Sequence, residues 1–369
     1  MIKNLYDRIQ VLEQEDELDR QQRLRAMARP LLSWYEDHAR SLPWRDDPTP
    51  YRVWISEIML QQTRVEAVKP YFERFMAALP TVQALAAVED DRLMKLWEGL
   101  GYYTRARNLK KAALMIEQRH GGALPASYEA LLDLPGIGSY TAGAIASIAF
   151  GIPVPAVDGN VLRVISRVLG DREDIRQPAV KARMEREIRE VMPSERTSQY
   201  NQGLIEVGAI VCVPGGEPRC GECPMESICL TRKQGLWKEI PVRGPLKKRK
   251  VEELTVCLIR RGDQVAIHKR PETGLLASLY ELPNAPGHLE PEQVIKAFGL
   301  QPELVEAVEP LPAAKHIFTH VEWHMAGYAV SLKEGGETDG DGAFFFVERQ
   351  AVKGKYPLPG AFKAYTKLI

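Results

Sequence analysis

Four of the five cysteines of this chain lie within eighteen residues. They are Cys212, Cys220, Cys223 and Cys229, separated by seven, two and five residues. In a reducing compartment, thiols grouped this closely indicate a metal site rather than disulfides. Zinc would accept four thiolates in tetrahedral geometry, whereas a 4Fe–4S cluster would take one thiolate per iron. The spacing therefore predicts a metal centre and leaves both metals open.

A Gly-x-Gly turn, Gly136 and Gly138 in "LPGIGSYTAGAIAS", opens an apolar helical run. Backbone N–H groups and the positive end of the helix dipole meet at such a turn, which suits a phosphate of a nucleic acid. Many Gly-x-Gly turns are only turns. Here the preceding "LLDLP" completes a helix, a turn and a second helix, which resembles the helix-hairpin-helix of DNA repair enzymes.

Asp158, in "VPAVDGNVLRVISRVL", precedes an amphipathic helix about twenty residues after that turn. Its ordinary role would be an N-cap worth about 1 kcal/mol. The same position keeps a carboxylate ionised, because the helix dipole favours negative charge there, so it could also face a developing positive charge. The residue alone leaves both roles open.

The elements that must position these groups fall into two regions of different predicted secondary structure. Apolar residues recur at helical spacing through the first two thirds of the 369 residues, whereas "EELTVCLIRRGDQVAIHKR", "HMAGYAVSL" and "GAFFFVERQ" predict strands. Residues 231–250 carry eight Lys or Arg against one Glu, which indicates a basic linker. Cys257 lies in an apolar alternating run and is expected to be a buried small residue.

Composition is that of a globular protein, with 45% hydrophobic and 27% charged residues. The N-terminus lacks the apolar core of a signal peptide. The longest weakly polar run, residues 141–157, is broken by glycine and prolines, whereas a membrane span needs about 20 apolar residues. We therefore expect a soluble, cytoplasmic monomer that does not enter membranes.

Taken together, these motifs resemble the endonuclease III superfamily of base-excision glycosylases and, within it, the adenine DNA glycosylases of the MutY family. The resembling segments are "LPWRDDPTPYRVWISEIMLQQTRV", "LWEGLGYYTRARNL", "LPGIGSYTAGAI", "AVDGNVLRV", the cysteine cluster, "KRPETGLLASLYELPN" and "HIFTH". The resemblance implies removal of adenine paired with 8-oxoguanine or guanine in double-stranded DNA. It also implies that Cys212, Cys220, Cys223 and Cys229 hold a 4Fe–4S cluster.

The implied fold is a mostly α catalytic region of two helical lobes followed by an α+β, Nudix-like domain. One lobe is expected at about 48–156, and the other joins the N-terminal helix to 157–229, with DNA at their junction. The expected divisions are an N-terminal helical extension (1–25), the glycosylase region (26–229) with its cluster loop (212–229), a basic linker (230–250) and the recognition domain (251–369). We assign no function to the extension.

Breaking an N-glycosidic bond needs a protonated leaving base and a stabilised sugar cation, two tasks that paired carboxylates perform in glycosidases. By resemblance, Glu57 is the general acid and Asp158 stabilises the sugar, while Tyr140 and Asn160 support these two carboxylates. The apolar neighbours of Glu57 in "WISEIML" would raise the pKa of its carboxyl by desolvation. Relatives that nick the strand carry a Lys at the position of Tyr140, whose amine forms a Schiff base. Tyr140 therefore predicts a monofunctional glycosylase.

Reaching adenine in a duplex requires flipping it out of the stack. By resemblance, Gln62 and Tyr102 enter the stack, and Thr63 and Leu100 lie near the lesion base. The residues expected to line the adenine pocket are Leu42, Trp44, Arg45, Val65, Gln202 and Glu206.

The C-terminal part resembles Nudix hydrolases, but "NAPGHLEPEQVIKAFGL" lacks the Glu-rich magnesium-binding helix. Without those carboxylates, metal-dependent hydrolysis is not expected. In the family a Phe-Ser-His turn contacts 8-oxoguanine, and the matching residues here are Phe318, Thr319 and His320. Thr keeps the hydroxyl group of Ser.

Formal net charge is zero, which is unusual for a DNA-binding protein. Phosphate contacts are therefore expected from local basic groups, namely Arg105, Arg107, Lys110, Lys111 and residues 243–250 of the linker. An exposed, unpaired surface accounts for these groups equally well. The first cysteine gap has seven residues where the family usually has six, which a loop outside the metal ligands can absorb.

Two other functions fit parts of the pattern. A pyrimidine glycosylase of the endonuclease III type is disfavoured by Tyr140 and by the C-terminal domain. A non-catalytic iron–sulfur DNA-binding protein is disfavoured by Glu57 and Asp158 together, since binding alone requires neither carboxylate.

Overall fold

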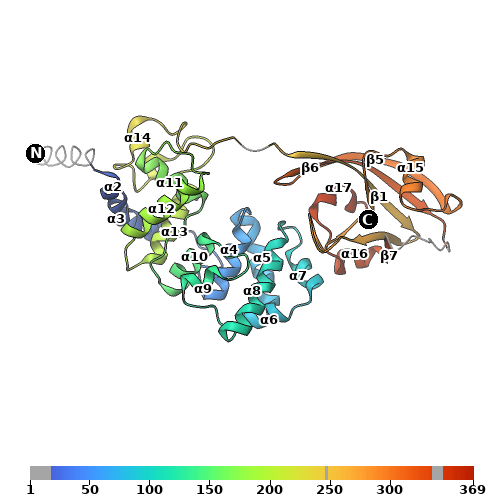
Figure 1. Ribbon diagram of the computed structural model, residues 1–369, viewed down its shortest axis with the longest axis horizontal. Helices are drawn as coiled ribbons and strands as arrows, with labels where there is room; N and C mark the ends of the chain where they lie inside the picture. Colours follow the sequence, from blue (N-terminus) through green and yellow to red (C-terminus); the bar gives the residue numbers. More distant parts are fainter. Residues whose placement is uncertain (1–17, 246–247, 335–343) are drawn as a thin grey trace, which may run out of the picture. The chain divides into compact units, whose positions relative to one another are not determined.

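The computed structural model describes residues 18–245, 248–334 and 344–369. It divides into two compact units that do not follow chain order (Figure 1). The first contains the described residues up to Ala86 together with Asn108–Pro245, and the second joins Ala87–Arg107 to the chain beyond Pro245. The predicted extension is described only from residue 18, so residues 1–17 lie outside the described part.

The first unit is helical. Its helices are α2 (Arg20–Ala26), α3 (Ala28–His38), α4 (Pro50–Leu60), α5 (Val65–Ala78), α6 (Val82–Ala87), most of α8 (Thr104–His120), α9 (Tyr128–Leu132), α10 (Ser139–Phe150), α11 (Gly159–Leu169), α12 (Pro178–Val191), α13 (Thr197–Ile210) and α14 (Leu230–Gln234). A short 3₁₀ turn, η1, covers Cys220–Glu222. The predicted helical character of the first two thirds is confirmed.

The predicted hairpin is formed by α9, the turn at Gly136 and α10. Ser127 caps α9 by accepting a hydrogen bond from Ala130 N. Gly136 has φ +80°, and a Cβ atom there would lie 2.7 Å from Asn108 Cβ. Only glycine satisfies both conditions, because other residues rarely adopt this φ and a Cβ would clash. Gly151, also in the left-handed region, ends α10.

The helices α2, α3, α11, α12 and α13 enclose one apolar core, which includes Leu24, Leu31, Ile165, Met184 and Leu204. The N-terminal helix α2 is thus part of the packed structure. Arg23 of α2 is 1% exposed and donates a hydrogen bond of 2.5 Å to the carbonyl of Ile228, beside Cys229.

The second unit contains a seven-stranded mixed sheet. Its strands are β1 (Lys250–Arg261), β2 (Gln264–Lys269), β3 (Tyr280–Glu281), β4 (Asn284–Pro286), β5 (Val305–Ile317), β6 (Val321–Leu332) and β7 (Phe345–Glu348). The path runs β3-β2-β1-β6-β5, with β4 beside β1 and β7 beside β2. β1 pairs with β6 in parallel, whereas the other pairs are antiparallel. The helical elements are α7 (Asp90–Trp97), α15 (Pro291–Ala297), α16 (Arg349–Lys355), α17 (Lys363–Thr366), η2 (Pro302–Leu304) and η3 (Gly360–Phe362).

Alternation along β1 divides its side chains between two cores. Val256 and Leu258 belong to one core, and Cys257 and Ile259 belong to the other. Successive side chains of a strand point to opposite faces, so both faces of this sheet are covered. Cys257 is fully buried, as expected.

The predicted combination of a mostly helical region and a C-terminal α+β domain is confirmed. In the described ranges, no helix has both the length and the apolar character needed to cross a membrane.

Candidate active site

Glu57 lies on the buried side of α4, which Thr49 caps and Pro50 begins. The Glu57 side chain is 7% exposed, and its Oε2 accepts a hydrogen bond of 2.7 Å from the hydroxyl of Tyr140 on α10. Burial is the main effect on the pKa of Glu57 and raises it; the nearby Asp158 also raises it, whereas the Tyr140 hydrogen bond and Arg45 lower it, with a net value of about 7. A carboxylic acid with this pKa is partly protonated near neutral pH and can donate its proton.

Asp158 is the N-cap of α11 and also a member of the site. Its Oδ1 accepts hydrogen bonds of 2.8 Å from the backbone N–H groups of Asn160 and Val161. Its Oδ2 accepts a third, also 2.8 Å, from Asn160 Nδ2. Burial raises the pKa of Asp158, and these three hydrogen bonds oppose the shift. Asp158 can therefore cap α11 and also serve as a carboxylate that faces a developing positive charge, the two roles that the sequence left open.

The hydrogen bonds support the charged forms of the two carboxyls unequally. Glu57 accepts a side-chain bond from Tyr140, whereas Asp158 accepts three bonds that favour the charged form. When two acidic groups share a site, the one with poorer support for its charge keeps the proton. Glu57 is thus suited to act as the acid and Asp158 as the anion.

A continuous hydrogen-bonded path leads from Asp158 toward the cysteine loop. Arg163 Nη2 donates to Asn160 Oδ1 over 2.8 Å, and Arg163 Nε donates to the carbonyl of Cys212 over 2.7 Å. Arg163 is 2% exposed and also donates to the carbonyl of Gly208. Its side chain thereby fixes the orientation of Asn160, and through it that of Asp158.

A small cavity of about 60 Å³ opens beside Glu57 and Tyr140. It brings together the residues expected to line an adenine pocket, and its lining further includes Arg40, Val53, Ser56, Leu60, Ile148 and Ile205. The expected residues found there are Leu42, Trp44, Arg45, Val65, Gln202 and Glu206.

Glu206 is fully buried in this wall and is held by two arginines. Arg40 Nε donates to Glu206 Oε1 over 2.5 Å, and Arg45 Nη2 donates to Glu206 Oε2 over 2.9 Å. Although burial alone would raise it, these bonds hold the pKa of Glu206 below its usual range. The carboxylate is therefore ionised and occupied by the two guanidinium groups.

The residues expected to enter the base stack share an unusual backbone. Gln62 has φ +58° and Tyr102 has φ +49°, both in the left-handed region that non-glycine residues rarely adopt. Both are exposed, Tyr102 by 49%. Thr63 follows Gln62 and donates from its hydroxyl to Gln61 O, whereas Leu100 is buried. Strained, exposed side chains of this kind are typical of binding sites.

In the second unit, Phe318, Thr319 and His320 form the tip of the β5–β6 hairpin, closed by a hydrogen bond from Phe318 N to Val321 O. Phe318 packs edge-on against Trp323, whereas Thr319 and His320 are exposed. The Tyr102 hydroxyl lies 3.3 Å from Thr319 Oγ1. Two of the residues expected to contact the lesion thus touch each other.

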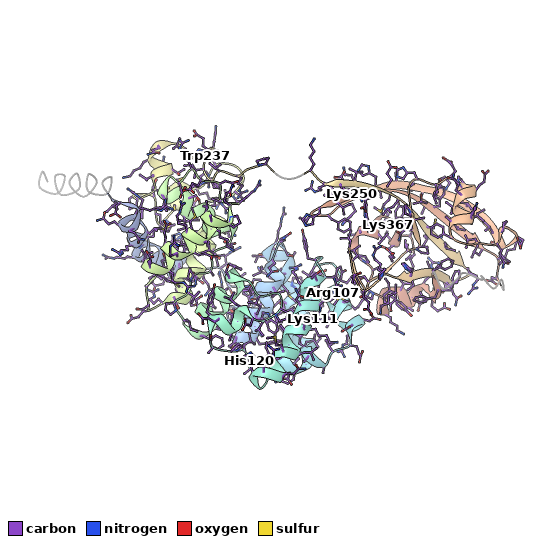
Figure 2. All side chains as sticks on the ribbon, in the orientation of Figure 1. Arg107, Lys111, His120, Trp237, Lys250 and Lys367 are labelled. Atoms are coloured by element: carbon purple, nitrogen blue, oxygen red, sulfur yellow. The ribbon has the colours of Figure 1, made fainter. Side chains whose placement is uncertain are left out.

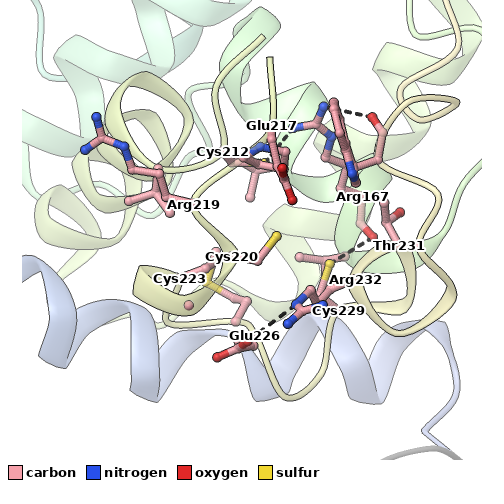
Figure 3. A pocket seen from close by; sticks show the side chains of 18 residues that line it. Arg167, Cys212, Glu217, Arg219, Cys220, Cys223, Glu226, Cys229, Thr231 and Arg232 are labelled. Atoms are coloured by element: carbon pink, nitrogen blue, oxygen red, sulfur yellow. Dashed lines mark hydrogen bonds and ion pairs between the residues drawn. The ribbon is translucent and has the colours of Figure 1, made fainter. Parts of the chain in front are cut away.

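The four clustered cysteines surround one cavity of about 400 Å³ in the first unit (Figure 3). Arg167 Nη1 lies 3.3 Å from Cys212 Sγ, and Cys229 Sγ donates to the carbonyl of Arg167 over 3.3 Å. The seven-residue first gap is closed at its base by a hydrogen bond from Arg219 N to Val211 O.

The cysteine thiols of this cavity can be compared with the ligands that zinc and a 4Fe–4S cluster require. Across the described chain, no three His, Cys, Asp or Glu side chains converge on one point as ligands of a single ion. Four zinc-bound sulfurs would lie within about 4 Å of each other, since Zn–S bonds measure about 2.3 Å. The four thiols line one cavity, and thiolate is the ligand type that both zinc and a 4Fe–4S cluster use.

Several residues of the site escaped the sequence analysis. Arg40 contributes to the pocket wall, and Arg163 links Asn160 to Cys212. Arg163 carried a usable signal, because residues three positions apart share one face of a helix. Conversely, Arg105 is not available as a phosphate ligand: it is buried and donates to the carbonyls of Leu100 and Gly101.

Comparisons with known proteins identify the families of both regions. A family model described as HhH-GPD superfamily base excision DNA repair protein matches residues 55–190, and a NUDIX domain model matches residues 255–368. The adenine DNA glycosylase of Homo sapiens is 33% identical over 365 residues, covering 82% of this chain and 66% of the human protein. That of Buchnera aphidicola from Schizaphis graminum is 32% identical, covering 82% of this chain and 86% of its own.

Solved structures match the helical region. A thermostable thymine-DNA glycosylase has a TM-score of 0.53 and 28% identity, covering 57% of this chain and 97% of its own. A non-covalent endonuclease III–DNA complex has a TM-score of 0.51 and 26% identity, covering 59% of this chain and 99% of its own. The chain therefore belongs to the adenine DNA glycosylase family, within the HhH-GPD superfamily of base excision DNA repair proteins.

Proposed function

We propose that this protein is a monofunctional glycosylase that hydrolyses the N-glycosidic bond of adenine paired with 8-oxoguanine or guanine in duplex DNA. The observation that carries the proposal is the pairing of a buried Glu57, whose pKa is raised to about 7, with a hydrogen-bonded Asp158. Curated relatives named adenine DNA glycosylase support the choice of base.

In the proposed reaction, Glu57 gives its proton to the adenine ring. The bond between C1′ and the base then breaks, and its electron pair leaves with neutral adenine. Asp158 stabilises the oxocarbenium-like sugar, and water adds to C1′ to leave an abasic site. Tyr140 orients Glu57, and Asn160 orients Asp158.

Strand cleavage is not part of this chemistry. A Schiff base needs an amine at C1′, and the group beside Glu57 is the phenol of Tyr140. The pKa of Tyr140 is raised far above its usual range, mainly by burial, so the hydroxyl stays neutral. It can donate a hydrogen bond but cannot attack the sugar.

The pocket must open to admit a flipped base. Its volume of about 60 Å³ is small beside the roughly 300 Å³ or more of ordinary ligand pockets. The Arg40–Glu206–Arg45 network forms a charged wall of this pocket. Arg45, which also binds Glu206, and Gln202, which also binds Ser198, are the polar groups that we assign to reading the edge of the base.

Lesion reading is assigned to the second unit. The exposed Tyr102 would enter the stack beside 8-oxoguanine, and Thr319 would bind the lesion base through its hydroxyl. Gln62 would enter the stack from the first unit.

A 4Fe–4S cluster fits the cysteine cavity, with Cys212, Cys220, Cys223 and Cys229 as its ligands. The bound cluster would fix the loop and leave the hydrolysis to the carboxylates. Arg167 is placed to donate to the Cys212 thiolate, and Arg163 connects the same residue to Asn160.

The test is single-turnover base release from duplexes containing adenine opposite 8-oxoguanine, adenine opposite guanine, or thymine glycol opposite adenine. We expect adenine release only, with strand breaks appearing only after alkali. Asp158→Asn should lose release and keep DNA binding. Release of thymine glycol with spontaneous nicking would instead indicate an endonuclease III activity, and tight binding without any release would indicate a non-catalytic protein.

A further inference from the structure

Helix α7 belongs to the same compact unit as the C-terminal domain, although more than 150 residues separate it from β1 in the chain. Asp91, in its first turn, accepts a hydrogen bond of 2.9 Å from the hydroxyl of Tyr280. Lys269 Nζ lies 3.5 Å from the other carboxylate oxygen of Asp91. One acidic side chain of α7 thus binds two groups of the C-terminal domain.

Two further residues continue this contact along α7. Lys95 Nζ donates to the carbonyl of Tyr356 over 3.4 Å, and Glu98 Oε1 accepts from Leu358 N over 2.9 Å. Positions 91, 95 and 98 recur at intervals of four and three, which places them on one face of a helix. We call Asp91 and Lys95 of α7, together with its C-cap residue Glu98, the docking face of α7.

On the C-terminal domain, aromatic packing holds the residue that contacts Asp91 in place. Tyr280 packs edge-on against Tyr356, with ring centroids 4.9 Å apart, and against Phe345, with centroids 6.2 Å apart. Tyr280 is 7% exposed. Edge-to-face aromatic contacts hold rings in defined orientations, so the Tyr280 hydroxyl reaches Asp91 from a fixed position.

A second anchor lies at the start of α8. Arg107, which Figure 2 labels, donates from Nη1 to the carbonyl of Ala277 over 2.6 Å. The residues on either side of Ala277, Leu276 and Ser278, have φ +56° and +59°. A loop with two non-glycine residues in the left-handed region is held in place by its surroundings. Arg107, expected to bind phosphate, is used for this contact instead.

Between the two anchors in the chain lies the turn that carries Tyr102. Arg105 donates to the carbonyls of Leu100 and Gly101, and its guanidinium lies 5.6 Å from the centre of the Tyr102 ring. The turn is therefore fixed from within, while the contact between Tyr102 and Thr319 joins it to the hairpin tip.

From these contacts we propose that α7 is a built-in docking helix for the recognition domain. Asp91 and Tyr280 act as positioning residues that keep Thr319 beside Tyr102 before DNA binds. The inference rests on the proposed function, because it concerns how that function distinguishes 8-oxoguanine from guanine. Two reading groups held together in advance lose less conformational entropy on binding the lesion, so the preference for it increases.

The test is Tyr280→Phe, which removes one hydroxyl and keeps the aromatic packing. Tyr328→Phe is the matched control, because the Tyr328 hydroxyl makes an equivalent 2.9 Å bond to Leu289 O within the same domain. Single-turnover adenine release is measured opposite 8-oxoguanine and opposite guanine. We expect Tyr280→Phe to lower the ratio of the two rates by roughly tenfold or more, as for loss of one hydrogen bond to a charged acceptor. Tyr328→Phe should leave the ratio unchanged.

A second variant tests the same contact from the α7 side. Asp91→Asn should lower the same ratio at least as much, because it weakens the contacts with both Tyr280 and Lys269. The double variant should be no worse than Asp91→Asn alone, because Tyr280→Phe acts on a contact that Asp91→Asn already weakens. Thermal melting verifies that each variant is folded. An unchanged ratio, or an equal loss opposite both bases, would overturn the inference while leaving adenine release itself in place. Absence of release in the unmodified protein would instead reject the proposed function.

Discussion

Tyr140 donates a hydrogen bond of 2.7 Å to Glu57, joining the first turn of α10 to the buried side of α4. This hydrogen bond opposes the rise in the pKa of Glu57 that burial causes. The balance between these two effects leaves the pKa of Glu57 at about 7.

Tyr140→Phe should shift the pH dependence of base release. Glu57 acts protonated, so activity falls as pH rises through its pKa. Removing the hydrogen bond that favours the carboxylate raises this pKa, and the alkaline limb should move to higher pH. We expect the maximal rate to fall about tenfold because the acid loses its orientation. A single-turnover pH profile measures both effects, and an alkaline limb that moves to lower pH would contradict the assignment.

Glu57→Gln should change stability in a pH-dependent way. The folded protein keeps the Glu57 proton up to about pH 7, whereas the unfolded chain releases it near pH 4.5. Stability from this group is present below pH 4.5 and is lost as pH rises through about 7. Relative to the unmodified protein, the variant should therefore gain about 3 kcal/mol of unfolding free energy between pH 4.5 and 8. Urea unfolding at several pH values tests this, and Glu66→Gln, at an exposed position, should show no such trend.

Glu206→Gln should destabilise the first unit. It would leave Arg40 and Arg45 without their buried counter-ion. Breaking a buried ion pair from one side costs about 3–5 kcal/mol, whereas exposed pairs contribute about 1 kcal/mol or less. Glu66→Gln, which breaks the exposed pair with Lys69, is the matched control. Similar midpoints of chemical unfolding for the two variants would argue against a buried network.

The hairpin glycines should differ in their tolerance of a methyl group. Gly136→Ala places a Cβ 2.7 Å from Asn108 Cβ at φ +80°, and it should lower the free energy of unfolding by about 1–3 kcal/mol. Gly138 has φ −100° and open space around its Cβ position, so Gly138→Ala should fold with nearly unchanged stability. Equal melting temperatures for the two variants would contradict the close approach.

Cys223→Ser should abolish metal binding. Purified protein is expected to contain about four iron atoms and inorganic sulfide per chain, as the one-thiolate-per-iron ligation of a 4Fe–4S cluster requires. The serine variant should lose both, together with visible absorbance. Cys257→Ala, in the core of the C-terminal domain, should retain them. One zinc per chain and no sulfide in the unmodified protein would reject the cluster.

Local patterns in the sequence determined much of the architecture. The helical spacing before residue 230, the strands around Gly262 and the Gly-x-Gly turn are short-range signals, and the structure confirms these elements. The grouping of four cysteines around one cavity also follows from nearby positions in the chain. Such features are determined by neighbouring residues, so composition and spacing are sufficient to predict them.

Only the tertiary structure decided which distant side chains meet. The contacts of Glu57 with Tyr140, of Glu206 with Arg40, and of Asp91 with Tyr280 join residues 83, 166 and 189 positions apart. Spacing along the chain carries no information about such pairs, because packing of whole helices and sheets brings them together. The same packing determines which charges are buried, and burial sets the pKa of Glu57 and the use of Arg105 and Arg107 within the protein.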